Sequence, residues 1–185
     1  MLLAVAMSLL SLYTAPVPCS VEELRQSPDY RYRIERIQEF LDSAAVIVRA
    51  VAVGPADVAD SGRTRNNPTI ISFVIQESLR GAELSDTLLL PGVVVDRDDF
   101  NTGTVPYTLV RPSGQRGSCY TLEYRQGAEY LLVLRESRRG LTPYWKPLAP
   151  FNEQIHGPDD PWVTWVRQQV AYSPGAARQR LAADR

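Results

Sequence analysis

The chain has 185 residues and a formal net charge of −1, with 20 basic and 21 acidic side chains. This length suits one domain with a substantial core. The balanced charge lacks the basic surplus of a nucleic-acid-binding module. We therefore expect a single domain and no nucleic-acid partner.

The chain begins with an apolar segment. Residues 2–12 read LLAVAMSLLSL, and residues 1–21 contain no charged side chain. The segment has the length of a signal-peptide core and is short for a membrane span, which needs roughly 20 apolar residues. We predict that residues 1–18 are a signal peptide and that the protein is secreted, periplasmic or part of the cell envelope. The alternative is an uncleaved anchor, which would be its membrane contact.

The first regular elements are predicted after this segment. Residues 27–29, Ser-Pro-Asp, carry helix-start signals, and apolar residues recur at helical spacing as far as Leu41. This predicts a short amphipathic helix packed on the domain. Residues 43–53, SAAVIVRAVAV, predict a strand that is apolar on both faces. Arg49 is its only charge, and we expect it to reach solvent over its own aliphatic stem.

Two more strands follow along the chain. Residues 69–79, TIISFVIQESL, alternate with period two over their first half. Residues 87–90, TLLL, predict a third strand, which Pro91 and Gly92 end. Residues 93–95 are expected to extend this strand only after a bulge.

Long connections separate these strands from their neighbours. Residues 54–68 are rich in Gly, Pro, Asp and Asn and read as a surface loop. Residues 96–117 show little periodicity, and a connection this long in a compact domain is usually functional or loosely ordered. We expect both connections to contribute to a contact surface.

Residues 117–134, GSCYTLEYRQGAEYLLVL, are the stretch around which the pattern is organised. Alternation in residues 120–125 predicts a strand with one buried face, and Gly127 suits a tight turn. Residues 130–134 are apolar on both faces, which favours a covered strand, although a short buried helix has the same periodicity. The prediction is a barrel hairpin.

A terminal helix is predicted near the end of the chain. Asp160 suits the N-cap position and Pro161 the first turn. Trp162 and Trp165 then fall on one face, which predicts that they dock on the barrel; the alternative is an exposed recognition patch. Residues 173–185 are expected to be a flexible tail.

Residues that carry chemistry are few. The chain has one histidine, His156, and lacks the G-x-S-x-G, H-E-x-x-H and C-x-x-C motifs. The acidic run at residues 96–99 does not continue with the spacing of a calcium loop. We expect no enzymatic activity, no metal site and no cofactor. The alternative is a hydrolase built from Asp96, Asp98, Asp99 and His156.

The two cysteines, Cys19 and Cys119, lie 100 positions apart. In an exported chain this suggests one disulfide bond, and two free buried thiols are the alternative. Closing a loop of that length stabilises a protein by about 4–5 kcal/mol in the chain-entropy model.

The pattern resembles a known family. A Cys-Ser at positions 19 and 20, the strand at residues 43–53, a strand ending in ESLRG and Cys119 shortly before GAEYLLVL are similar to the netrin-like domain. The closest form is the N-terminal domain of tissue inhibitors of metalloproteinases, and the similarity covers residues 19–134. It implies a mainly β fold, a five-stranded OB-type barrel, and pairing of Cys19 with Cys119. Together with the predicted helices this gives a single domain over residues 19–172, with an N-terminal and a C-terminal helix.

The resemblance also implies a function. In the inhibitors, the amine and carbonyl of the N-terminal Cys chelate the zinc of the protease, and these roles fall on Cys19, followed by Ser20. Cleavage after Pro18 would free that amine. We therefore expect an exported, non-enzymatic binding module with a protein partner, and a zinc protease is the partner class that the resemblance implies. The alternative is a membrane-tethered structural protein of the envelope.

Overall fold

The fold is mainly β, as predicted, with a helix on either side of the strands in the chain. The structure, a computed structural model, describes residues 33–56, 69–81, 85–116, 119–138, 140–143 and 145–172. The predicted signal peptide, Cys19, Ser20 and the predicted tail lie outside these residues. The strands are β1 Val46–Pro55, β2 Thr69–Arg80, β3 Thr87–Val95, β4 Glu123–Arg125, β5 Glu129–Ser137, β6 Gly140–Thr142 and β7 Asn152–Ile155, and the helices are α2 Arg33–Ser43, α3 Pro112–Gln115 and α4 Pro161–Tyr172.

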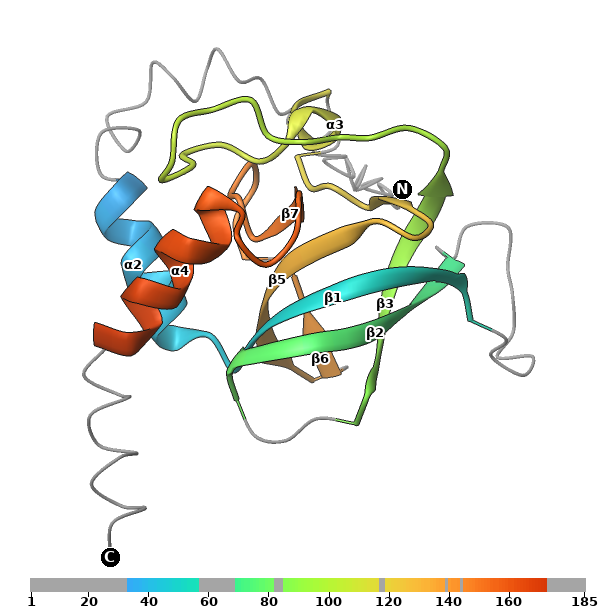
Figure 1. The fold of residues 1–185 in the computed structure, drawn as a ribbon, viewed down its shortest axis with the longest axis horizontal. Helices are drawn as coiled ribbons and strands as arrows, with labels where there is room; N and C mark the ends of the chain where they lie inside the picture. Colours follow the sequence, from blue (N-terminus) through green and yellow to red (C-terminus); the bar gives the residue numbers. More distant parts are fainter. Residues whose placement is uncertain are drawn as a thin grey trace, which may run out of the picture.

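The strands form a sheet that curls on itself (Figure 1). β1, β2 and β3 make an antiparallel meander. β4 then pairs parallel with β3, and β5 pairs antiparallel with β1, so these two consecutive strands bind opposite edges of the meander. The turn at residues 126–128 joins the two edges, and Gly127 adopts a φ of 78° there, which glycine tolerates without steric cost. β6 and β7 extend the sheet by pairing with β5.

The predicted hairpin at residues 120–134 has the expected turn and strands, but its pairing is wrong. The ladders of β4 and β5 run to β3 and β1. β4 is also short, because it begins at Glu123. A curled sheet has two edges whose backbone groups need partners, and dividing the hairpin between them provides a partner for each edge.

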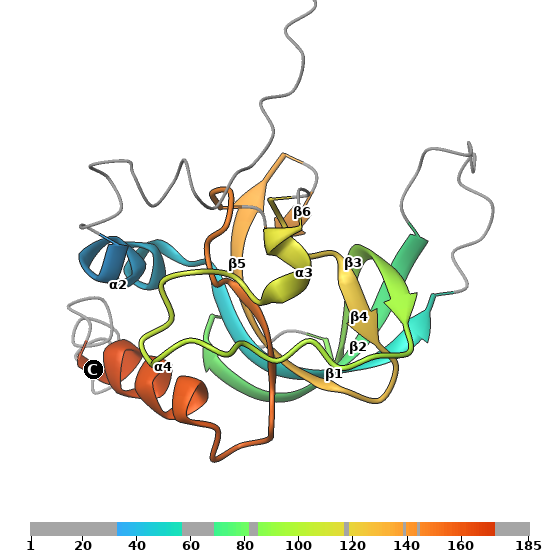
Figure 2. The same ribbon diagram turned by 90° about the horizontal axis from the view of Figure 1, so that it is seen from above.

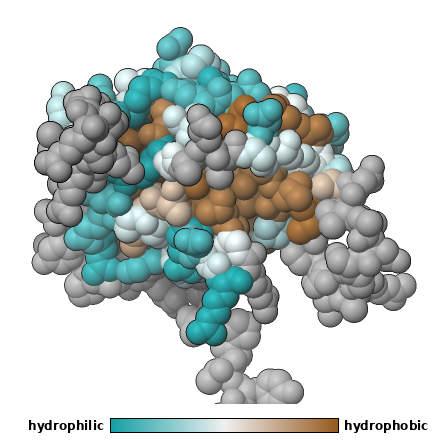
Figure 3. All heavy atoms as spheres, turned by 90° about the horizontal axis from the view of Figure 1, so that it is seen from below, coloured by the Kyte–Doolittle hydropathy of each residue, from teal (hydrophilic) through white to brown (hydrophobic). Residues whose placement is uncertain are grey.

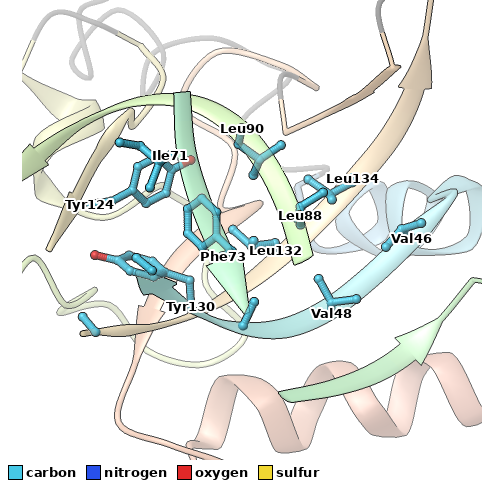
Figure 4. Packing of buried hydrophobic residues seen from close by; sticks show 13 residues of the cluster. Val46, Val48, Ile71, Phe73, Leu88, Leu90, Tyr124, Tyr130, Leu132 and Leu134 are labelled. Carbon is cyan, nitrogen blue, oxygen red and sulfur yellow. The ribbon is translucent and has the colours of Figure 1, made fainter. Parts of the chain in front are cut away.

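The concave side of the sheet holds the first hydrophobic cluster (Figure 4). Alternate residues of β1 point into it, from Val46 to Ala52, in agreement with period two. Three aromatic rings meet in this cluster: the ring centroids of Phe73 and Tyr124 lie 4.8 Å apart, and those of Tyr124 and Tyr130 lie 5.2 Å apart. Both pairs are edge-to-face, a favoured geometry for aromatic side chains.

Pro91 and Gly92 do not end the third strand, contrary to the prediction. β3 runs continuously through both residues, and Gly92 pairs with Thr69 of β2. A Cβ atom at Gly92 would lie 2.5 Å from the ring of Tyr124. The glycine is therefore required by the close approach of the backbone to a core ring.

The helices cover part of the convex side of the sheet (Figure 2). α4 begins as predicted: Pro161 is its first residue, and the Oδ1 atom of Asp160 accepts a hydrogen bond from the backbone N–H of Trp162 at 2.8 Å. Trp162 is fully buried, so the predicted docking of this tryptophan is confirmed. The second hydrophobic cluster includes Leu41, Ile47, Leu131, Trp162 and Val166, which come from both helices and from β1 and β5.

Arg49 does not simply reach solvent, which corrects the expectation for this residue. Its Nε donates a hydrogen bond to Glu77 at 3.0 Å, and its Nη1 is bound to Glu129. Glu77 also binds Arg167 of α4 at 3.1 Å. These partners come from other strands and from the terminal helix, so the pattern of β1 alone could not reveal them.

Candidate functional site

One end of the curled sheet is covered by residues 96–116, which follow β3, together with β7. Arg111 lies at the centre of this cover and is fully buried. Its Nη1 donates to the carboxylate of Asp99 at 2.8 Å, its Nε donates to the carbonyl of Asn152 at 2.8 Å, and its Nη2 donates to the carbonyl of Glu123 at 2.7 Å. The guanidinium also lies 5.1 Å from the ring centroid of Tyr130. Each nitrogen of the buried cation is thus hydrogen-bonded, as burial of a charge requires.

The carboxylate of Asp99 also binds the backbone of α3. It accepts the backbone N–H of Ser113, at the start of α3, at 3.0 Å. The backbone N–H of Asp99 in turn donates to the Oε1 atom of Gln154 on β7 at 2.8 Å. Asp99 therefore connects the segment after β3, the short helix α3 and the strand β7.

β7 is made almost entirely of polar residues, yet every one of its residues is buried. Asn152 donates to the hydroxyl of Tyr124 at 2.6 Å, and Gln154 donates to Asp98 at 2.5 Å. We call Asp99, Arg111, Asn152, Glu153 and Gln154 the polar network. The sequence analysis missed this network because Asn-Glu-Gln-Ile has no strand-like alternation, and its partners lie about 30 to 55 positions away.

Glu153 is the most unusual group of the network, because its side chain is completely buried. Oε2 accepts a hydrogen bond from Asn101 Nδ2 at 2.9 Å, and Oε1 accepts one from the backbone N–H of Arg111 at 3.2 Å. Burial raises the pKa of Glu153 to about 8, and the nearby positive charge of Arg111 offsets only part of this rise. The carboxyl group is therefore mostly protonated at neutral pH.

The residues of the alternative hydrolase are engaged in separate contacts. The ring of His156 stacks on Phe100 with ring centroids 3.8 Å apart. Asp98 pairs with Arg125, and Asp99 is held inside the polar network. Among the described residues, no hydrogen bond joins the His156 ring to these aspartates.

A shallow hollow opens beside this network, at the end of β3. Its volume is about 570 Å³. Arg97 and Arg125 contribute half-exposed guanidinium groups, which are paired with Glu123 and Asp98 at 2.8 and 2.9 Å. The hollow is lined by Val94, Val95, Asp96, Arg97, Arg125 and Gln126.

The hollow lies where two of the predicted contact segments meet. Asp96 and Arg97 open the segment at residues 96–117, and the carboxamide of Gln126 lies beside Gly54, the first residue of the segment at residues 54–68. Residues 57–68 lie outside the described part of the chain, as do Cys19 and Ser20. The pairing of Cys19 with Cys119 therefore stays a prediction.

The described residues contain no group of three or more His, Cys, Asp or Glu side chains arranged to hold a metal ion. No helix in the described ranges is both long and apolar enough to cross a membrane.

The buried ion pair can be tested against an exposed one in the same region. Arg111 and Asp99 have side chains 0% and 5% exposed, whereas those of Arg125 and Asp98 are 45% and 46% exposed. Arg111→Met leaves a buried carboxylate without its cation and should lower the free energy of unfolding by about 3–5 kcal/mol. Arg125→Met should cost less than about 1 kcal/mol. Urea unfolding followed by tryptophan fluorescence measures the loss of unfolding free energy in both variants. Equally small losses would contradict the conclusion that the pair of Arg111 and Asp99 is a buried structural contact.

The raised pKa of Glu153 predicts a dependence of stability on pH. A group whose pKa is higher in the folded state than in the unfolded state stabilises the folded protein. This stabilisation is complete at pH values below the unfolded-state pKa and is lost as the pH rises to the folded-state pKa. The contribution of Glu153 should therefore fall between about pH 4.5 and 8, with a slope approaching about 1.4 kcal/mol per pH unit. Glu153→Gln should flatten this slope, measured as urea midpoints at pH 5 to 9. The same slope in both proteins would show that Glu153 is not the titrating group.

Comparisons of the chain with protein-family models, with curated proteins and with solved structures found no match. The similarity to the netrin-like domain therefore remains a hypothesis.

Proposed function

We propose that the chain is an exported, non-enzymatic protein-binding module built on an OB-type barrel of the netrin-like kind. The order of the strands supports the barrel. β1 to β5 form one hydrogen-bonded path whose ends, β4 and β5, are joined by the turn at residues 126–128. The turn brings the two ends of this path next to one another, as a five-stranded barrel requires, and β6 and β7 would then be additions to the barrel.

The observation that carries the binding role is the hollow at the barrel end. It combines the apolar side chain of Val94 with the half-exposed guanidinium groups of Arg97 and Arg125. Arginine is enriched where proteins contact one another. The hollow is also open and shallow, which suits the surface of a protein better than an enclosed small molecule.

The surroundings of the hollow support a rigid site. Arg125 and Gln126 belong to β4 and to the tight turn after it, and Asp96 and Arg97 directly follow β3. The polar network fixes the segment that continues from Arg97, through Asp99. A contact surface held on strands and a buried ion pair loses little conformational freedom on binding.

Site-specific photo-crosslinking tests this surface. A photo-reactive amino acid in place of Gln126 should give a light-dependent adduct with a discrete protein of the secreted or envelope fraction of the source cells. Excess wild-type protein should compete with the adduct. The control carries the same amino acid in place of Glu136, an exposed residue near the end of β5. Identical products at both positions, or none at position 126, would contradict the proposal.

Inhibition of a zinc protease is the specific form of this function that the resemblance suggests. It requires that the mature chain begin at Cys19, because only then is the amine free to bind zinc. Mass spectrometry of the exported protein shows at which residue the mature chain begins. A chain beginning at Cys19 should inhibit a zinc protease at micromolar protein, and one extra alanine before Cys19 should abolish inhibition. If the chain inhibits none of a panel of zinc proteases, the proposal of protease inhibition is wrong. The broader proposal of a protein-binding module is unaffected.

A further inference from the structure

The convex side of the meander is only half covered. At the start of β1, Ile47 is fully buried beneath the helices. Further along the same side of the same strand, Val51 is half-buried and Val53 is 46% exposed. The strand is apolar on this side throughout, apart from Arg49, so the cover ends while the apolar surface continues.

The uncovered part extends over three strands. Val51 lies opposite Val74 of β2, and Leu89 of β3 lies opposite Ser72 of β2. Leu89 is 51% exposed and Val74 is 39% exposed. Hydrophobic residues form a broad area in the view from below, the side on which β2 and the start of β3 lie (Figure 3). We call this surface the apolar sheet face and define it by Val51, Val53, Ile70, Val74, Leu89 and Pro91.

The apolar sheet face contains no ionisable side chain. Among the described residues, the ion pairs beside it join two arginines and two glutamates: Arg49 with Glu77 and Glu129, and Arg167 with Glu77. These four side chains together carry no net charge. A partner that docks here needs no complementary charge and must itself present an apolar, uncharged surface.

The way in which a partner can dock is restricted by the strand pairing. β1 is hydrogen-bonded to β2 and β5, and β2 is hydrogen-bonded to β1 and β3. Neither strand has a free edge to which a peptide could add as a further strand. β3 pairs with β4 only at Val93–Val95, so a partner that covers β1 and β2 as well as β3 packs on the side chains, as one sheet packs on another.

From these observations we infer that the apolar sheet face is the interface of a symmetric dimer between two copies of this chain. A copy related by a twofold axis offers the same uncharged apolar surface, so the contact buries no unpaired charge and brings no like charges together. A membrane surface fits less well, because proteins that lie on membranes usually present lysines or arginines beside their apolar residues. Patches of this kind amount to a few hundred Å² per copy, which predicts a weak dimer.

Sedimentation of the exported chain over a range of concentrations tests this inference. The weight-average mass should rise from that of one chain toward that of two as the concentration increases through the micromolar range. Leu89→Lys should keep the mass at one chain at every concentration, because it places a charge in the middle of the contact. Its melting temperature at low concentration should stay close to that of wild type, because Leu89 is exposed in the single chain.

The matched control is Tyr172→Lys, which changes an exposed apolar residue at the end of α4, outside the apolar sheet face. This variant should dimerise like wild type. A wild-type chain that stays monomeric overturns the inference, and so does a dimer that Leu89→Lys leaves intact. A monomer that binds vesicles of neutral phosphatidylcholine through Leu89 would show a membrane contact instead. The test is independent of the hollow, so its failure leaves the proposed function standing.

Discussion

Arg111 is the centre of the polar network at the end of the curled sheet, because its buried guanidinium group binds three segments at once. It binds the side chain of Asp99 and the backbone of β4 and β7. A cation buried to this degree is stable only when its charge and its donors are satisfied. The positions of residues 96–116 and β7 therefore depend on one another. The arrangement cannot lose one partner without leaving another charge or polar group unsatisfied.

The molecule has two kinds of surface, the hollow beside the polar network and the apolar sheet face. At the barrel end, a long connection is held in place by polar contacts and presents charged and apolar groups together in the hollow. On the convex side of the meander, β1 to β3 present a neutral apolar surface beyond the point where the helices stop. The hollow suits recognition of a different protein, and the apolar sheet face suits contact with an identical copy. A dimer through the sheet face would carry two hollows.

Features governed by local periodicity could be predicted from the sequence. The alternation in β2, the start of α4 at Asp160 and the turn at Gly127 each depend on neighbouring residues, and the structure contains all of them. Features governed by distant partners could not be predicted in this way. Arg49 looked like a solvated charge because Glu77 and Glu129 lie on other strands.

The same limit applies to the candidate site. Asp96 and Arg97 could be placed on a contact surface from the character of their segment, but the hollow also needs Arg125 and Gln126, which the fold brings beside them. No element is predicted from the sequence at residues 152–155, because their burial depends on hydrogen bonds to Asp99 and Tyr124. Gly92 read as a strand end because the ring that requires it, Tyr124, lies 32 positions further along the chain.

Hydrogen exchange of backbone amides measures directly whether residues 96–116 are held rigidly at the end of the curled sheet. The amides of Asp99, Arg111 and Ser113 donate to Gln154, Glu153 and Asp99 respectively. We predict that these three amides exchange as slowly as the amides of β5 in the sheet. Exchange at the rate of an unprotected loop would contradict it, because the segment would then be mobile and the hollow would not be a preformed surface.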